Sequence, residues 1–176
     1  MVQPAGMWSY VALLRGVNVS GSTPLPMRDL ARLCEEAGHS NVRTFLTSGN
    51  AVFRSCARET EVRAGLESRL TALAGKPIRV HVRRADEMDA VMRGNPWPHA
   101  PGSQAMAIFL DDRPTPEMLA GVKNQAPNEL LALGHRELYV WYGSGQGQSR
   151  MRIPAAQWGT ARNMNTVAKL AALSAA

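Results

Sequence analysis

The chain has 176 residues, of which 45% are apolar and 19% charged, and its net charge is +6. This length suffices for one large domain or two small ones, and the apolar content is too high for a disordered chain. No run of 18 apolar residues occurs, which excludes a membrane-spanning helix, and the first residues lack the apolar core of a signal peptide. We therefore expect a globular, cytoplasmic protein that does not contact a membrane.

The first half of the chain is predicted to have the element order βαββαβ. Strands are assigned where apolar residues run together or alternate, and helices where they recur at a spacing of three or four. The turn signal Ser48-Gly49-Asn50 makes the second and third strands a hairpin. The strands are expected at 8–17, 41–47, 51–55 and 78–83, and the helices at 27–37 and 60–74.

Two of these strands carry information about what covers the sheet. The run Tyr10–Leu14 is apolar on both faces, so a layer on each side must cover it, and we expect the second half of the chain to be one of them. In the fourth strand, apolar residues alternate with Arg79, His81 and Arg83. We expect this strand to have one packed face and one basic face in contact with water.

The second half is predicted to repeat this plan without its last strand. A short helix at 86–93 and a proline-rich loop at 94–102 come first. The order that follows is βαββα, which lacks the final strand of the first half and ends in a helix. The strands are expected at 105–110, 128–133 and 137–142, and the helices at 116–123 and 163–173.

These orders predict an α+β fold made of two ferredoxin-like (α/β-plait) halves. Each half would have an antiparallel sheet with helices on one face. We place the first half at residues 7–84 and the second at residues 85–176.

Four stretches, in order along the chain, carry a family resemblance. They are LLRGVNVSG, the NVRTFLTSGNAVF hairpin, the Asn95-Pro96-Trp97 turn and the closing TARNMNTVAKL. Together they resemble the bacterial family called domain of unknown function 1697, over residues 10–170 or so. The resemblance implies two α/β-plait subdomains, in agreement with the order of elements, and it implies no activity.

The loop after the first strand is the first candidate site. Rigid scaffolds often hold binding residues on such loops, and this one carries Arg15 and Asn18 beside glycines. A guanidinium and backbone N–H groups could bind an anion here. The alternative is structural, with Arg15 paired to a carboxylate and Asn18 capping a turn. Ser48 and Asn50 would join this site only if their turn lies at the same end of the sheet, which the sequence leaves open.

The start of the last helix is the second candidate site. Arg162 and Asn163 precede this helix, and Asn165 and Thr166 lie in its first turn. The free N–H groups and the partial positive charge of a helix N-terminus suit phosphate or carboxylate, and Lys169 lies on an adjoining face. The alternative is that Asn163 is only an N-cap and Arg162 only braces the two halves.

Other kinds of chemistry have fewer residues to support them. The four histidines lack the spacing of metal ligands and no cofactor motif is present, so we expect neither metal nor cofactor. A catalytic base or nucleophile would have to come from Ser48, His81, Asp111 or Asp112. An RNA-binding sheet would stack bases on aromatic residues, and Phe53 is the one aromatic on the third strand.

The leading hypothesis is a module that binds a small phosphate- or carboxylate-bearing ligand, such as a nucleotide, in a cleft between the two halves. Its contacts would be Arg15, Asn18, Arg162 and Asn163. The alternatives are an enzyme acting on a small anionic substrate, a module that binds RNA or another nucleic acid, and an interaction scaffold. The sequence leaves open whether the protein is an enzyme and what its oligomeric state is.

Overall fold

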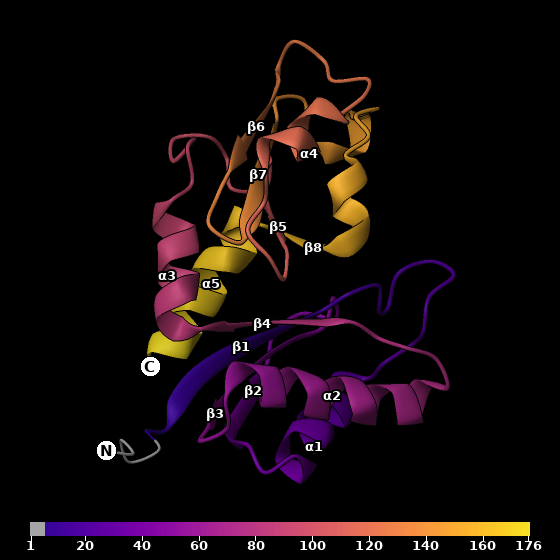
Figure 1. Cartoon of the computed structure of the whole chain (residues 1–176), viewed down its shortest axis with the longest axis vertical. Helices are drawn as coiled ribbons and strands as arrows, with labels where there is room; N and C mark the ends of the chain where they lie inside the picture. Colours follow the sequence, from indigo (N-terminus) through magenta and orange to yellow (C-terminus); the bar gives the residue numbers. More distant parts are fainter. Residues whose placement is uncertain (1–5) are drawn as a thin grey trace. The chain divides into compact units, whose positions relative to one another are not determined.

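A computed structural model describes residues 6–176, which form two compact units (Figure 1). Unit 1 runs to Met88 and also includes Leu170–Ala176. Unit 2 spans Asp89–Lys169.

Unit 1 has the predicted order βαββαβ. Its sheet is antiparallel with the order second–third–first–fourth strand, and both helices lie on one face of it (Figure 1). This is the predicted ferredoxin-like arrangement. The strands are β1 (Trp8–Leu14), β2 (Ser40–Thr44), β3 (Asn50–Ser55) and β4 (Val80–Arg84), the helices are α1 (Met27–Glu36) and α2 (Glu59–Ala74), and α3 (Ala85–Arg93) follows β4.

The central strand β1 is buried on both faces, as its apolar run predicts. Residues Tyr10–Leu14 are at most 2% exposed. One face packs in the core beneath α1 and α2. On the other face the hydroxyl of Ser9 donates to the backbone oxygen of Ser174 at 2.7 Å, so the C-terminal residues of unit 1 lie against this side of the sheet.

The prediction of a basic, water-facing side on β4 is wrong. His81 is 0% exposed and Arg83 is 1% exposed, and only Arg79, which precedes the strand, is exposed. The reason lies in the pairing, because His81 stands opposite Leu13 of β1 and Arg83 opposite Val11. Side chains opposite each other share a face of the sheet, so these two are buried together with β1.

Unit 2 repeats the sheet of unit 1. The prediction that this half lacks its last strand is wrong, because Thr160–Asn163 pairs antiparallel with the first strand of the sheet. Four residues reading TARN are too few and too polar to reveal a strand by alternation. The strands are β5 (Ala105–Phe109), β6 (Glu129–Leu133), β7 (Glu137–Tyr142) and β8 (Thr160–Asn163), in the order β6-β7-β5-β8, and the helices are α4 (Pro116–Ala120), the 3₁₀ helices η1 (Gln146–Gln148) and η2 (Pro154–Trp158), and α5 (Met164–Ala175).

The core of unit 2 lies between its sheet and α4 with η2 (Figure 1). Ile108, Leu138 and Val140 are at most 3% exposed and form its centre. The helix α4 on this face has five residues, and the chain between β7 and β8 contributes the 3₁₀ helix η2. The two sheets therefore share one topology and differ in what covers them.

At the end of β1, the loop that follows is tied to the β2–β3 hairpin by one side chain. The Asn18 amide accepts from the N–H of Leu25 at 2.6 Å and donates to the backbone oxygens of Leu25 and Thr47, both at 2.7 Å. Asn18 has a φ of 55°, which asparagine tolerates better than most residues. The side chain thus joins two loops as a backbone β-bridge would.

The hairpin turn lies at this same end of the sheet, which the sequence left open. Gly49 has a φ of 89°, and a Cβ there would come within 2.8 Å of Leu14 Cβ and of Val17 Cγ2. The N–H of Leu14 also donates to the backbone oxygen of Gly49 at 2.8 Å. The turn therefore requires glycine for both its conformation and its approach to β1.

The core beneath α1 and α2 contains one histidine. The His39 ring stacks on Phe53 with centroids 4.4 Å apart and planes 7° apart. His39 is 8% exposed, and within residues 6–176 neither of its ring nitrogens has a hydrogen-bond partner. Burial, with a smaller contribution from the charge of Arg69, lowers the pKa of His39 below its ordinary value of 6.5.

We expect Asn18→Ala to destabilise the protein by about 1–3 kcal/mol more than Asn124→Ala, because net hydrogen bonds contribute about 0.5–1.5 kcal/mol each. Both asparagines have a φ of 55°, so the cost of a positive φ for alanine is matched, and only Asn18 loses side-chain bonds between loops. Urea unfolding of the two variants measures the difference. Equal losses would show that the Asn18 bonds contribute nothing.

We expect the stability of the protein to fall as the pH drops below about 6.5, partly because His39 must stay neutral in the folded state. A lowered folded-state pKa means that the unfolded chain binds the proton more readily, so the contribution is complete above 6.5 and decreases below it. Urea unfolding of the wild type and of His39→Leu at pH 7.5 and pH 5 should give a smaller pH effect for the variant. The same pH effect in both proteins would contradict this.

Candidate anion-binding site

The first predicted site is assembled at one end of the unit 1 sheet, but its amides are already bonded to the protein. Asn18 makes the three loop bonds described above. Asn50 is 0% exposed and donates to the backbone oxygen of Phe45 at 2.7 Å and to the Ser48 hydroxyl at 3.0 Å. Arg15 is half-buried, and its backbone N–H donates to the backbone oxygen of Arg79 at 3.0 Å. These bonds support the structural alternative for Asn18, in which its side chain caps a turn.

The second predicted site also has most of its donors engaged. Asn163 is the N-cap of α5, because its Oδ1 accepts from the N–H of Thr166 at 2.9 Å. The N–H of Met164 donates to the backbone oxygen of Gly102 at 3.0 Å. With these two donors bonded, the start of α5 has less capacity for an anion than the sequence pattern suggests.

Arg162 lies within β8 and is 6% exposed. One of its terminal nitrogens donates to the Thr160 hydroxyl at 2.8 Å and to the backbone oxygen of Ala161 at 2.9 Å. Burial lowers the pKa of its guanidinium to about 10, so it stays protonated at neutral pH. The side chain is therefore a cation, and its bonds to Thr160 and Ala161 are made to neutral oxygens.

A small pocket of about 280 Å³ lies beside the start of α5, in unit 2. Asn165 lines it together with Asn95 and Gly102, whereas Lys169 is exposed and does not. None of the residues that line it is charged. It brings two of the sequence stretches together, the Asn95-Pro96-Trp97 turn and the closing TARNMNTVAKL, without the cations that an anion site needs.

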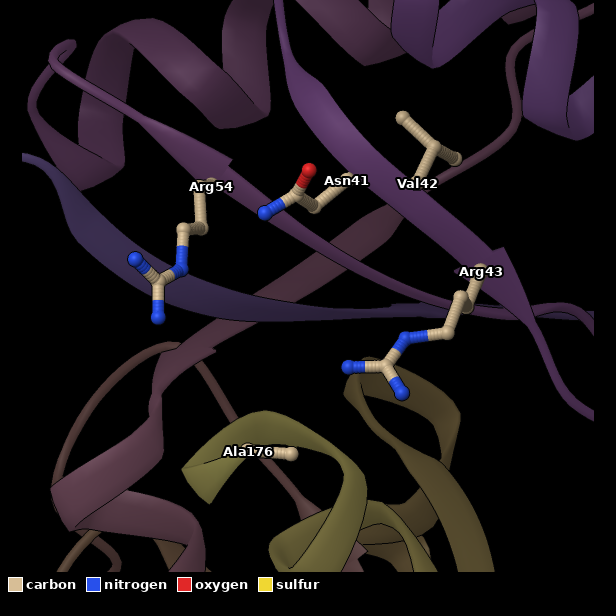
Figure 2. A pocket seen from close by; sticks show the side chains of 5 residues that line it. All are labelled: Asn41, Val42, Arg43, Arg54 and Ala176. Atoms are coloured by element: carbon tan, nitrogen blue, oxygen red, sulfur yellow. The ribbon is translucent and has the colours of Figure 1, made fainter.

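A pocket with two arginines lies on the other unit (Figure 2). An open pocket of about 480 Å³ is lined by Asn41, Val42, Arg43, Arg54 and Ala176, all of which belong to unit 1. Figure 2 shows both guanidinium groups on the side where Ala176 lies, and the Val42 side chain turned away from them. No carboxylate side chain lines this pocket.

A β-bulge in β2 places Arg43 in this pocket. Ser40 stands opposite Arg54, yet Arg43 stands opposite Val52, so the pairing shifts by one residue between Ser40 and Arg43. Asn41, inside the shift, has a φ of 52°. A shift of one residue exchanges the faces of a strand, so Arg43 joins Arg54 on one face while Val42 packs toward the core on the other. Without the bulge, Val42 would take the place of Arg43.

The two arginines have few partners within the protein. Arg43 donates to the backbone oxygen of Leu173 in the last turn of α5 at 3.1 Å, a favourable position for a cation. The Arg54 side chain forms no hydrogen bond or ion pair with any residue from 6 to 176. Each guanidinium has five donors, so most of the donors of this pair point to solvent. The arrangement can hold a phosphate or a carboxylate through paired N–H groups.

The sequence reading missed this pocket. Neither Arg43 nor Arg54 is among the site residues predicted from the sequence. The positive φ of an asparagine gives a weak signal for a bulge, since Asn41 could equally belong to a turn. The pairing of Arg43 with Arg54 depends on the register of β2, which sequence alternation does not fix.

The residues expected to serve a catalytic or nucleic-acid site are placed elsewhere. His81 is 0% exposed within the unit 1 sheet, and Asp111 and Asp112 follow β5 in unit 2. Phe53, the expected stacking aromatic, is 1% exposed in the core beneath α1 and α2, so bases cannot stack on it. Across residues 6–176 we find no group of three or more histidine, cysteine or acidic side chains suited to a metal ion, and no helix long and apolar enough to cross a membrane.

Comparisons with known proteins place the chain in a family. The conserved bacterial protein SP0830 from Streptococcus pneumoniae has a similar structure, with a TM-score of 0.79 at 19% sequence identity, over 96% of this chain and 99% of that one. This similarity shows the fold alone. No curated protein matches the chain. The sequence pattern of the family described as protein of unknown function (DUF1697) matches residues 7–139, and the chain belongs to that family.

Proposed function

We propose that this protein binds a small phosphate- or carboxylate-bearing ligand, in the cytoplasm, through Arg43 and Arg54. The observation that carries the proposal is that a β-bulge brings two guanidinium groups to one open pocket with no acidic side chain among its lining residues. Guanidinium groups bind phosphate and carboxylate through two parallel N–H bonds, and these charge-assisted bonds are the stronger ones.

The net charge, the Asn41 amide and the size of the pocket also favour an anionic ligand. The charge of +6 raises the local concentration of anions around the protein. The Asn41 side chain adds an amide that can donate or accept at the rim of the pocket. A ligand with one phosphate or carboxylate and a small polar body suits an open pocket of about 480 Å³.

The lining residues support binding and not acid–base catalysis. The side chains in the pocket are an amide, two guanidinium groups and apolar groups. Arginine stays protonated in proteins, and none of these groups is a nucleophile or a general base near neutral pH. The enzyme hypothesis thus has no reacting group at this site.

Binding is tested by calorimetric titration of the protein with inorganic phosphate, pyrophosphate, citrate and nucleoside monophosphates. Arg54→Ala should weaken the binding of any hit about tenfold or more, because a hydrogen bond to a charged group contributes about 1.5–3 kcal/mol and 1.4 kcal/mol is a factor of ten. Arg54→Lys should recover only part of this loss, since lysine cannot bind in the paired geometry. Arg43→Ala should weaken binding in the same direction.

The matched control is Arg28→Ala, which removes an exposed arginine of α1, on the helix-covered side of the same sheet, and changes the net charge equally. Its affinity should stay within about twofold of the wild type, because exposed charges farther apart than a Debye length are largely screened. An equal loss in Arg28→Ala and Arg54→Ala would reduce the effect to overall charge and overturn the proposal.

The contacts expected from the sequence, Arg15 and Arg162, stay a prediction, and the same titration tests them. A ligand whose binding is lost in Arg15→Ala and unchanged in Arg54→Ala would bind at the predicted contacts and not in this pocket.

A further inference from the structure

The four edge strands of the two sheets differ in how they are protected. An edge strand presents unpaired backbone groups that can pair with another chain, and proteins commonly block such pairing with charges or bulges. The edges β2, β4 and β8 each carry an arginine, and β2 also has its bulge. The edge strand β6 differs, because its run Leu130–Leu133 has no charge and no proline, and its pairing with β7 is regular throughout.

The exposed side chains of β6 are apolar. Leu130 is 40% exposed and Leu133 is 37% exposed, so both belong to the exposed large apolar residues of the described part of the chain. Leu131 packs at the border of the unit 2 core, and Leu133 lies on the same face of the strand. The strand therefore presents apolar side chains beside an open backbone edge.

The hydrogen bonds around β6 show which backbone groups point outward. Asn128 accepts from Gly143 at 3.1 Å, and Gly134 donates to Glu137 at 2.7 Å. Because bonded pairs alternate in an antiparallel ladder, the even-numbered residues between them face β7 and the odd-numbered ones face away. Leu131 and Leu133 thus point their N–H and C=O groups outward.

The outward groups of β6 are closed at one end only. Glu129 donates its N–H to the backbone oxygen of Ala126 at 3.0 Å and accepts from Gln125 Nε2 at 2.7 Å. Among residues 6–176, no group bonds the outward N–H or C=O of Leu131 or Leu133. Two donors and two acceptors remain, spaced two residues apart.

We infer that β6 pairs with β6 of a second copy of this chain, antiparallel and centred on Ala132. In this register Leu131 stands opposite Leu133 of the second copy, and Leu133 opposite its Leu131. The two pairs supply four backbone hydrogen bonds and join the two sheets into one of eight strands.

A second copy fits because the outward-facing groups of β6 match those of another β6 strand. Two outward-facing residues spaced two apart match the same two residues when the strand is turned around, and both leucine side chains then meet leucines on one face. No charged residue lies in Leu130–Leu133, so the net charge of +6 on each copy places no like charges opposite each other there. The inference is independent of the proposed anion site.

The register is tested by disulfide trapping in the full chain, with the exposed Cys56 replaced by serine and the buried Cys34 left in place. Ala132→Cys puts two sulfurs opposite each other across the axis, at a non-bonded pair with a Cα separation of about 4.5 Å. Leu130→Cys is the matched control on the same face of the same strand. Its two copies would lie four residues apart along the strands, roughly 13 Å, which is too far for a disulfide.

Under mild oxidation, Ala132→Cys should form a covalent dimer at least ten times faster than Leu130→Cys, at rates that rise with protein concentration. Adding Leu133→Lys should slow the reaction at least tenfold, since it places a charge beside the paired strands. Equal rates in the two cysteine variants, or no effect of Leu133→Lys, would overturn the inference.

The same inference is tested without new cysteines, in case Ala132→Cys impairs folding. Sedimentation velocity of the wild type between about 10 µM and 1 mM, the range of weak association, should change from monomer to dimer. Leu133→Lys should remain monomeric over this range with an unchanged melting temperature. A wild type that is monomeric throughout, or a Leu133→Lys variant that dimerises equally, would contradict the pairing.

Discussion

A strand that is apolar on both faces must be covered on both, and β1 imposes this requirement on unit 1. Its residues Tyr10–Leu14 are at most 2% exposed. The helices α1 and α2 cover one side, and the C-terminal residues of α5 lie on the other, where Ser174 accepts from Ser9. Burial of apolar area stabilises the unit, so this strand needs a cover on its second face as well as the helices on its first.

This second cover also gives Arg43 its place. The last turn of α5 presents backbone oxygens, and Arg43 donates to one of them, at Leu173. A cation at a helix C-terminus is favourable, so the contact stabilises both groups. Ala176, next to this cover, lines the pocket together with Arg54. The charged pocket therefore lies between the covered centre of the sheet and its open edge at β2.

The element order was predictable because periodicity is a local property. Tyr10–Leu14 revealed the central strand, and the βαββαβ order of unit 1 follows from such local patterns. Which side chains of the sheet are buried was less predictable, because burial depends on what packs on each face. His81 and Arg83 alternate with valines and look exposed, yet they share the covered face of β1. The strand β8 has only four residues and gives no periodic signal.

The candidate sites illustrate the same limit. Asn18 and Asn163 were recognised as polar residues at element ends, and both serve there as caps or clamps. Their residue type suits such a role as well as it suits a ligand, and only the partners decide between the two. Arg43 and Arg54 are 11 positions apart in the sequence, and their common face depends on one extra residue in the register. No local pattern encodes that shift.

One structural feature accounts for both the pocket and the protection of the β2 edge. A bulge bends a strand and breaks its regular row of backbone groups, which opposes pairing with another chain. The same bulge turns Arg43 toward Arg54 and Val42 toward the core. The equivalent edge of unit 2, β6, has neither a bulge nor an arginine and keeps leucines at its surface. In the two proposals made here, sheets of identical strand order differ in what they bind, because an irregular edge can recognise ions through side chains whereas a regular edge can pair with another strand through its backbone.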